Sequence, residues 1–371
     1  MSARWLLLAW AFTLPAFAQQ AETQAAGMRV ESPPPDGGML RLRDLTPFGL
    51  LRLDMRPPRA HGEWRGDWAF ELDLAYQNTF ATSINVRNYL SARSGGRRPL
   101  DPADAAAIYA LPGDAYLIDG EFGRYELIVH RRLDDRWSAS LALPYLSYSS
   151  GALDSFIEDF HDAFSFRQQA RDFVARNSFQ VVYEFGGLQY AQLGRTVDGG
   201  FGDPVLSVAW HGPRAWRGWY ATAEAATKLA VDGRREWLST GRNDYGLQLA
   251  TGRGFGRQAV HVAASIVHYS GERGTPAARD RLVPTLIAAW SRQFGDRTRL
   301  IAQGYASESV VDETDVGALA ARKYLLSLGL RHDAKRLAWT AAITNNIGSH
   351  HNAPDFGLQL NLLYRPQGQR D

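Results

Sequence analysis

Cysteine is absent from this chain of 371 residues, which excludes disulfide bonds, thiolate metal sites and cysteine nucleophiles. Beyond the N-terminal leader, no apolar run approaches the roughly 20 residues that a transmembrane helix needs. Neither sign of charge is in excess, because 41 basic residues face 39 acidic ones, and nucleic-acid binding requires a basic surface. We therefore expect no nucleic-acid partner and no membrane-spanning helix.

The chain begins with the three parts of a secretory signal peptide. Arg4 supplies the positive charge, Trp5–Leu14 the apolar stretch, and Ala16–Ala18 a small-x-small cleavage site. No cysteine follows that site, so the leader is not of the lipoprotein type. We expect cleavage near Ala18, which leaves 371 − 18 = 353 residues, long for one soluble domain.

Residues 19–66 are predicted to form an irregular N-terminal segment, either in the periplasm or as a plug. Ser32–Gly38 contains three consecutive prolines and two glycines, which neither a helix interior nor a central strand accommodates. Leu40–Leu53 could form a short extra element or the plug itself.

From residue 67 to residue 364, short segments alternate apolar and polar side chains with the period of a β-strand. In the first segment Glu71, Asp73 and Gln77 lie on the polar face, opposite a face of apolar residues. We predict fourteen such strands: Asp67–Phe80, Tyr116–Arg131, Trp137–Tyr148, Phe179–Phe185, Leu188–Gly194, Leu206–Trp210, Trp219–Val231, Tyr245–Leu249, Val260–Ile266, Leu282–Trp290, Leu300–Ala306, Tyr324–Leu330, Leu337–Ile343 and Phe356–Tyr364.

The connections between these segments alternate between short turns and longer polar loops, as they do in outer-membrane barrels. The pattern predicts an all-β protein, a transmembrane antiparallel up-and-down β-barrel of about 14 strands, with 12 or 16 as alternatives, over residues 67–364. A tail, 365–371, follows. A soluble periplasmic β-protein is the competing interpretation, but its outward faces would carry charge, which these faces lack. Residues expected to face lipid include Leu72, Leu141, Leu247, Val262 and Leu360.

Residues 151–177 break the strand pattern. Asp154 or Ser155 can cap a helix, and aromatic and aliphatic residues then recur at helical spacing, which predicts a short amphipathic helix in an external loop. Glu158, His161 and Asp162 share the opposite face, so they could form a metal or acid–base site. The favoured interpretation is the polar face of a loop helix. The apolar face comprises Phe156, Ile157, Phe160 and Phe164.

The same stretch resembles a family of uncharacterised outer-membrane proteins of Gram-negative bacteria, known only as a domain of unknown function. The shared pattern is Gly-x-Leu-Asp-x-Phe-Ile-Glu-x-aromatic-His-Asp-x-Phe, here 151–164, followed by Arg-Asp-x-x-x-Arg-Asn at 171–177. The family's Asn-Pro-aromatic motif appears here as Thr46-Pro47-Phe48, a departure that weakens the match of that segment. The resemblance implies a barrel in the outer membrane and no established activity.

These observations favour passive transport of small molecules, hydrophobic ones included, through an outer-membrane channel. A surface-exposed structural or adhesion protein and a barrel-embedded hydrolase are the alternatives, although His261 and Ser265 share a face predicted to point inward. Expected partners are outer-membrane lipid, an unknown small solute, and periplasmic chaperones with the barrel-assembly machinery. We predict no catalytic, cofactor-binding or metal-binding residues. Candidate pore or loop residues are Asp154, Glu158, His161, Asp162, Arg171 and Arg176.

Between the two candidates that could restrict the pore, the sequence favours the loop helix over the N-terminal segment. The loop has an apolar face that could fold inward. Its arginines, Arg167, Arg171 and Arg176, could pair with lumen carboxylates such as Glu126 or Glu184.

Overall fold

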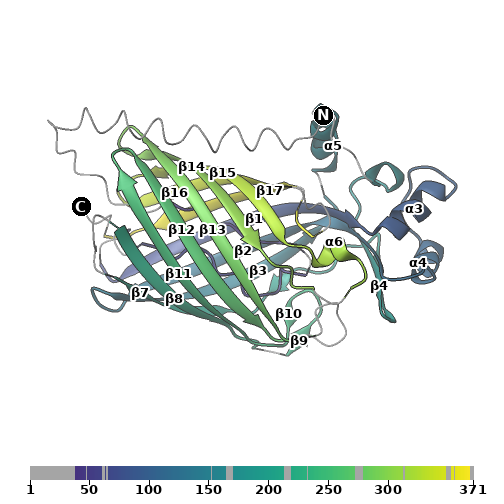
Figure 1. The fold of residues 1–371 in the computed structure, drawn as a ribbon, viewed down its shortest axis with the longest axis horizontal. Coiled ribbons are helices and arrows are strands. Elements are labelled where there is room, and N and C mark those ends of the chain that lie inside the picture. The colour runs from purple at the N-terminus through teal and green to yellow at the C-terminus, as the bar shows by residue number, and fades with distance from the viewer. Residues whose placement is uncertain are drawn as a thin grey trace.

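The computed structural model describes residues 38–46, 48–60, 63, 66–151, 153–163, 170–212, 219–231, 233–271, 279–311, 314–347, 352–354 and 356–367. The predicted signal peptide therefore lies outside the described residues. Within the described ranges, twelve long strands form a closed ring (Figure 1). Its order along the chain is β1 (Trp68–Thr82), β2 (Ala115–Arg132), β3 (Trp137–Ser149), β7 (Val205–His211), β8 (Trp219–Lys228), β11 (Asp244–Phe255), β12 (Gln258–Tyr269), β13 (Arg281–Phe294), β14 (Thr298–Ser307), β15 (Lys323–Asp333), β16 (Leu337–Asn346) and β17 (Phe356–Tyr364).

The ring closes through β1, which pairs antiparallel with both β2 and β17. Each of the other strands also pairs antiparallel with its two neighbours in the ring, and β3 reaches across to β7. Closure leaves no open sheet edge around the ring, so backbone groups along the wall bond to each other rather than to solvent.

Each of the fourteen predicted segments contains a strand, but the predicted count of about 14 for the barrel is too high by two. The fourth and fifth segments form a hairpin outside the ring, β4 (Gln180–Phe185) and β5 (Leu188–Leu193). This hairpin continues the sheet from Ala115–Asp119, because β2 is 18 residues long and extends beyond β3. Short strands also form outside the ring: β6 (Gly200–Phe201), β9 (Arg234–Arg235) and β10 (Ser239–Thr240).

Apolar side chains cover the outside of the ring, and polar side chains line the inside. Leu72, Leu247 and Leu360, all predicted to face lipid, are exposed on the outer face, whereas Leu141 is half-buried. On the same β1 strand Glu71 is completely buried. Among the described residues no helix is long and apolar enough to cross a membrane. An apolar outer wall with a charged interior is the arrangement that a bilayer requires of a closed barrel.

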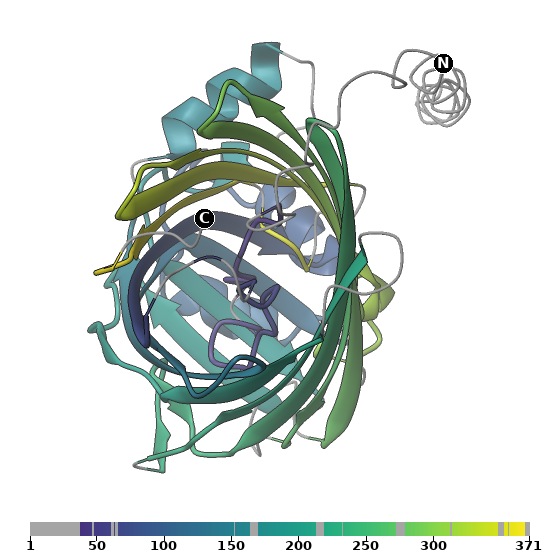
Figure 2. The same cartoon turned by 90° about the vertical axis from the view of Figure 1, so that its left-hand side faces the viewer.

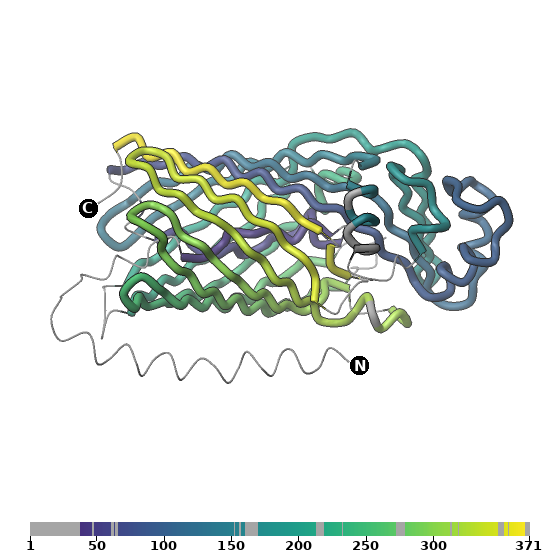
Figure 3. The backbone as a smooth tube through the Cα atoms, turned by 90° about the horizontal axis from the view of Figure 1, so that it is seen from above, coloured from purple at the N-terminus to yellow at the C-terminus, as the bar shows by residue number. Residues whose placement is uncertain are grey.

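The two ends of the barrel differ. At the turn end the strands are joined by short connections, such as the turns at Gly256 and Gly295, whose positive φ values of 59° and 62° suit glycine. At the loop end the connections are long and carry folded elements (Figure 3). The helices there are α3 (Ile84–Ala92), α4 (Pro102–Tyr109), α5 (Asp154–Ala163), the 3₁₀ turn η2 (Arg171–Phe173) and α6 (Gly317–Ala320).

Helices α3 and α4 lie in the connection between β1 and β2 and form a small lobe with β4, β5 and the end of β2. Asp101 caps α4 by accepting hydrogen bonds from the backbone N–H groups of Ala103 and Asp104. The Asp104 side chain completes a capping box, and Pro102 begins the helix. Apolar side chains from both helices, β1, β2 and β4 form the core of this lobe: Phe80, Val86, Leu90, Ile108, Leu117 and Val182.

Candidate functional site in the barrel lumen

A described part of the chain before β1 lies inside the barrel. We define the luminal segment as the described residues 38–60 together with Glu63. A view along the barrel shows it, in purple, within the ring of strands (Figure 2). No regular helix or strand forms among the described residues of this segment.

The luminal segment crosses the barrel twice. Gly38 lies against the ring of His261, where an ideal Cβ would be 1.9 Å from Nε2, so only glycine fits. Leu45 and Leu50 reach a core at the loop end that includes Tyr116. The chain then returns to the turn end, where Glu63 lies near the start of β1.

Side chains of the wall satisfy the backbone of the luminal segment. Gln303 holds Leu40 from both sides: its Oε1 accepts from the Leu40 N–H at 2.8 Å, and its Nε2 donates to the Leu40 carbonyl at 2.9 Å. Gln77 likewise accepts from the Leu45 N–H at 2.9 Å and donates to the Arg43 carbonyl at 2.7 Å. Buried backbone groups without such partners would be costly, so these glutamines stabilise the irregular segment inside the lumen.

Further wall side chains hold the second pass. Asp244 accepts a hydrogen bond from the Leu53 N–H at 3.0 Å, and the Tyr269 hydroxyl donates to the Leu53 carbonyl at 2.9 Å. Gln248 donates to the Met55 carbonyl at 3.0 Å. Together with the two glutamines of the first pass, these contacts join the segment to strands around the ring.

Three wall carboxylates lie close together beside the luminal segment. Asp73 on β1 is directly opposite Glu126 on β2, and Glu71 is two residues before Asp73. All three are at most 1% exposed. Like charges directly opposite each other in a sheet are destabilising, so this wall requires compensating cations.

The luminal segment supplies those cations. Arg56 lies between two of the carboxylates, with Nη1 2.6 Å from Asp73 Oδ2 and Nη2 3.1 Å from Glu126 Oε2. Arg59 Nη2 is 3.0 Å from Glu71 Oε1. Breaking a buried pair of this kind leaves an uncompensated charge, so the arginines fix the position of the segment. Arg41 also forms an ion pair with Glu71, and Arg43 forms one with Glu126.

A second set of charges closes the turn end of the lumen. Glu63 Oε2 is 3.1 Å from Arg59 Nη1, and its Oε1 is 3.2 Å from Arg331 Nη1 on β15. Arg365, just after β17, donates to the Glu63 carbonyl at 3.2 Å and is fully buried. Glu63 of the luminal segment and Arg365, which follows the last strand, therefore meet at the turn end of the lumen.

At the loop end, the structure brings together four of the six candidate residues predicted from sequence. Asp154 accepts hydrogen bonds from Arg171 Nη1 at 3.0 Å, Asn78 Nδ2 at 3.2 Å and the Asn177 N–H at 2.7 Å. These contacts tie the loop to the rim of the barrel through Asn78 on β1. The side chains of the other two candidates, His161 and Asp162, lie outside the described residues.

Glu158 forms the second half of this loop cluster. Arg97 Nη1 is 3.2 Å and Arg176 Nε is 2.8 Å from Glu158 Oε2. Burial alone would raise the pKa of Glu158, but hydrogen bonds from the two arginines outweigh it and lower that pKa below its ordinary value. Glu158 is thus held as a carboxylate by its two partners.

The predicted pairing of the loop arginines with lumen carboxylates is wrong. Arg171 and Arg176 pair with the loop's own Asp154 and Glu158. Glu126 instead pairs with arginines of the luminal segment and with Arg124 of its own strand. The other two residues of that prediction do not test it, because Glu184 belongs to β4, outside the ring, and Arg167 lies outside the described residues. Phe164 of the predicted apolar helix face also lies outside the described residues.

Sequence reasoning missed the arginines of the luminal segment. Arg41, Arg43, Arg56 and Arg59 stand immediately before a strand whose inward face carries Glu71 and Asp73. That complementarity between the arginines and the inward carboxylates was a signal in the sequence, but the prediction of a possible plug rested on the irregular segment alone and named none of its arginines.

The inner wall carries the serine and histidine that a hydrolase would need, but among the described residues they are not joined. His261 and Ser265 both lie on the inner face of β12, as predicted. His261 Nδ1 is 3.0 Å from the Tyr220 hydroxyl, and within the described ranges no hydrogen bond joins it to Ser265. Across the same residues no group of three histidine or acidic side chains is placed to hold a metal ion.

The closed antiparallel ring, apolar outside and charged inside, defines the class of outer-membrane β-barrels. Within this class, residues 78–365 match the model of a family described as "Protein of unknown function (DUF3187)". The chain belongs to that family, as the resemblance in the sequence implied. A comparison with curated proteins finds no match.

Solved structures with a similar course of the chain include several outer-membrane proteins. The COG4313 outer membrane channel from Pseudomonas putida F1 is 11% identical, with a TM-score of 0.48 over 82% of this chain and 97% of that one. The NanC porin is 7% identical, with a TM-score of 0.40 over 79% and 99%. The CymD monoaromatic hydrocarbon channel is 8% identical, with a TM-score of 0.35 over 89% and 94%.

Proposed function

We propose that the protein is a channel for small molecules in the outer membrane of a Gram-negative bacterium, and that the luminal segment is its plug. The observation that carries the proposal is the double passage of the segment through the lumen, where Arg56 compensates the carboxylates of Asp73 and Glu126. A barrel of twelve strands has a narrow lumen, so two passes of chain leave little room for a solute. Conduction then requires the segment to move.

The contacts of the plug suit a reversible attachment. Its partners are ion pairs and side-chain hydrogen bonds, which water and solute can replace, and apolar contacts are concentrated at Leu40, Leu45, Leu50 and Leu53. A lumen freed of the segment would expose both Glu126 and Arg124, so we assign no preference for the sign of a solute.

The orientation follows from the ends of the barrel. Short turns face the periplasm in outer-membrane barrels, and the longer loops face outward. Gly38 lies beside His261, in the half of the lumen nearer the turn end, and Glu63 lies at the turn end itself. We therefore propose that the plug is anchored from the periplasmic side, so that a force or ligand acting there could withdraw it.

A crosslink across the lumen tests the proposal. An ideal Cβ on Gly329 would lie 2.5 Å from Leu40 Cδ2, and the chain has no native cysteine. The double substitution Leu40→Cys, Gly329→Cys would therefore place two thiols within reach of a short, reducible bis-thiosulfonate linker. In planar bilayers we expect openings before crosslinking, none while the linker is intact, and their return after reduction.

Two controls make the result decisive. Leu40→Cys alone, treated with the same linker, should keep its openings. Deletion of residues 38–60 should raise conductance several-fold, because the lumen loses both passes. Conductance that is indifferent to the crosslink would contradict the plug, and silence of both the full chain and the deletion variant would contradict the channel.

A second candidate function, recognition at the cell surface, is favoured by the lobe built from α3, α4, β4 and β5. This lobe has its own apolar core and projects beyond the ring. Replacing residues 84–109 with a short glycine–serine linker should leave the conductance unchanged if the two roles are separate. Loss of cell-surface binding in that variant, with normal conductance, would assign recognition to the lobe.

A further inference from the structure

Three outward positions of the wall carry arginine at the turn end, where the apolar outer face stops. They are Arg131 on β2, Arg253 on β11 and Arg292 on β13, and we call them the arginine rim. On β2, for example, Arg131 follows Leu127 and Val129 on the same outer face. A long basic side chain at the end of an apolar wall keeps its stem against lipid and extends its charge towards water.

Each guanidinium of the arginine rim lies over an aromatic ring of the same outer face. A cation over a ring face is attracted to it within about 6 Å of the ring centre. This contact uses no hydrogen-bond acceptor, so the N–H groups of the guanidinium remain available to an anion. The distances from Cζ to the ring centre are 4.6 Å for Arg131 over Trp68, 4.8 Å for Arg253 over Phe255 and 5.6 Å for Arg292 over Phe294.

The charges of the arginine rim are not neutralised within the protein. In the part of the chain that the structure describes, no carboxylate lies within ion-pair distance of these three guanidinium groups. The inner face of the same wall is different, since Arg124 on β2 pairs with Glu126 at 2.7 Å. The rim therefore presents oriented, uncompensated cations to a partner outside the barrel.

The position of the arginine rim determines which partner it meets. The short turns of an outer-membrane barrel face the periplasm, and the leaflet on that side consists of glycerophospholipids. Aromatic rings at the edge of an apolar wall mark the level of the headgroups, so the guanidinium groups lie at the level of the lipid phosphates. An anionic headgroup complements them, whereas the ammonium group of a zwitterionic headgroup finds no carboxylate beside them.

We propose that the arginine rim binds anionic phospholipids of the periplasmic leaflet. Each guanidinium donates charge-assisted hydrogen bonds to a lipid phosphate, and the ring beneath it contacts the glycerol and the first acyl carbons. Arg253 is opposite Val260 and Arg292 is opposite Gln258, so these two arginines flank β12 and act on neighbouring headgroups. The proposal rests on the orientation given under Proposed function, and it is independent of the plug and of conduction.

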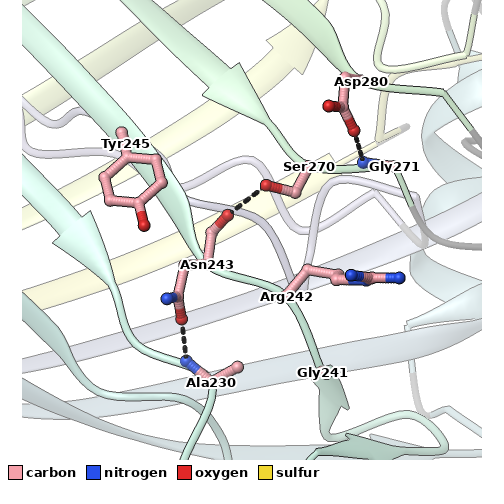
Figure 4. A pocket seen from close by; sticks show the side chains of 8 residues that line it. All are labelled: Ala230, Gly241, Arg242, Asn243, Tyr245, Ser270, Gly271 and Asp280. Carbon is pink, nitrogen blue, oxygen red and sulfur yellow. Dashed lines mark hydrogen bonds between the residues drawn. The ribbon is translucent and has the colours of Figure 1, made fainter.

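The loop end offers arginines for a matched comparison. Arg242 is exposed beside a polar hollow of about 580 Å³ (Figure 4). Among the described residues no aromatic ring lies beneath its guanidinium. Arg195 and Arg322 are also exposed at this end, and Arg322 Nη2 is 3.7 Å from Glu308 Oε1. Removing these three arginines changes the net charge as much as removing the rim does, but leaves the rim intact.

Native mass spectrometry of the full chain in detergent tests the rim, with equal amounts of phosphatidylglycerol and phosphatidylethanolamine that carry the same acyl chains. We expect the unmodified chain to retain the anionic phosphatidylglycerol about tenfold better, since each basic residue adds to the attraction of an anionic lipid. The triple variant Arg131→Gln, Arg253→Gln, Arg292→Gln should lose this preference. The loop-end variant Arg195→Gln, Arg242→Gln, Arg322→Gln should keep it.

Heat-modifiability gels establish that both triple variants are folded. If the rim variant is not, Arg292→Gln alone provides the test, because this side chain is exposed, and it should reduce the preference at least twofold. Equal retention of the two lipids by the unmodified chain would overturn the proposal and leave the rim to an acidic periplasmic protein. Equal losses in the rim and loop-end variants would overturn it as well, because net charge alone would then explain the preference. Lipid retention is measured without conductance, so a silent channel leaves the result unaffected.

Discussion

The luminal segment and the loop that carries α5 are both rich in arginine and acid, yet their charges are paired in opposite ways. Arginines of the luminal segment reach carboxylates of the wall, as Arg56 reaches Asp73 and Glu126. Arginines of the loop end mostly reach the loop's own acids, as Arg176 reaches Glu158. The first pattern attaches a segment to the barrel, and the second mainly folds a loop onto itself.

The two networks also differ in burial. The Arg56 side chain is 7% exposed, whereas that of Arg176 is 52% exposed. Charge interactions are much stronger where water is excluded than at a surface. A count of nearby charges therefore cannot identify a plug, because what matters is which element supplies the partner and how far water is excluded.

The largest effect is expected from Arg56→Ala. The substitution leaves the carboxylates of Asp73 and Glu126 with less compensation in a buried site, so it should lower the free energy of unfolding by about 3–5 kcal/mol. Urea unfolding in detergent micelles measures this, and bilayer recordings should show more frequent openings. Arg257→Ala, at an exposed turn, should change neither property. A stable, silent Arg56→Ala variant would show that the segment does not depend on this arginine.

The next largest effects are expected from substitutions on the outer and inner faces of the barrel wall. Leu247→Arg places a charge in lipid and should cost about 2–4 kcal/mol. The alternation of the sequence, taken alone, predicts that Gln77→Arg is tolerated, because Gln77 would line a water-filled lumen. Gln77 is instead 4% exposed and holds the backbone at Arg43 and Leu45, so we expect that substitution to cost about 1–3 kcal/mol. Heat-modifiability gels of both variants test this: an unaffected Gln77→Arg would mean that the segment is loosely held.

Most of the strands could be predicted from the sequence, because alternation is a local property. Leu72 and Glu71 take opposite faces in any β-strand, whatever lies beside it. The number of strands in the ring could not be predicted in the same way. Residues 180–193 alternate like barrel strands, and only the excess length of β2 places them outside the ring. Closure depends on which strands pair, and period alone carries no information about pairing.

The candidate site was predicted only in part, for a similar reason. The sequence named Asp154, Glu158, Arg171 and Arg176, and these do meet at the loop end. The partners predicted for the two arginines lie in the lumen, whereas the loop itself provides nearer acids. Arg56 pairs with Asp73 and Glu126 from a segment of irregular structure, and no periodic pattern in the sequence predicts such a pairing. A capping box such as Asp101 with Asp104 could have been found, since it is local.

Acid should loosen the loop that carries α5. The pKa of Glu158 is lowered in the folded protein, so its contribution to stability is present above the ordinary carboxyl pKa of about 4.3 and is lost as the pH falls through the lowered value. Hydrogen exchange of residues 170–178, corrected for the intrinsic pH dependence, should therefore accelerate in acid. Glu158→Gln should exchange faster at neutral pH and lose this component of the acid response. If Glu158→Gln keeps the full acceleration of exchange in acid, groups other than Glu158 cause that acceleration.

The smallest effect is expected from Arg176→Ala, and it sharpens the comparison most directly. Arg176 and Arg56 each contact a well-buried carboxylate, but half of the Arg176 side chain is in water. Glu158 also keeps Arg97 when Arg176 is removed. The cost should therefore fall within the range of about 0–1 kcal/mol found for exposed ion pairs. Urea unfolding under the conditions used for Arg56→Ala gives the comparison, with channel openings unchanged. A loss as large as that of Arg56→Ala would mean that the loop, like the luminal segment, is held to the barrel by its charges.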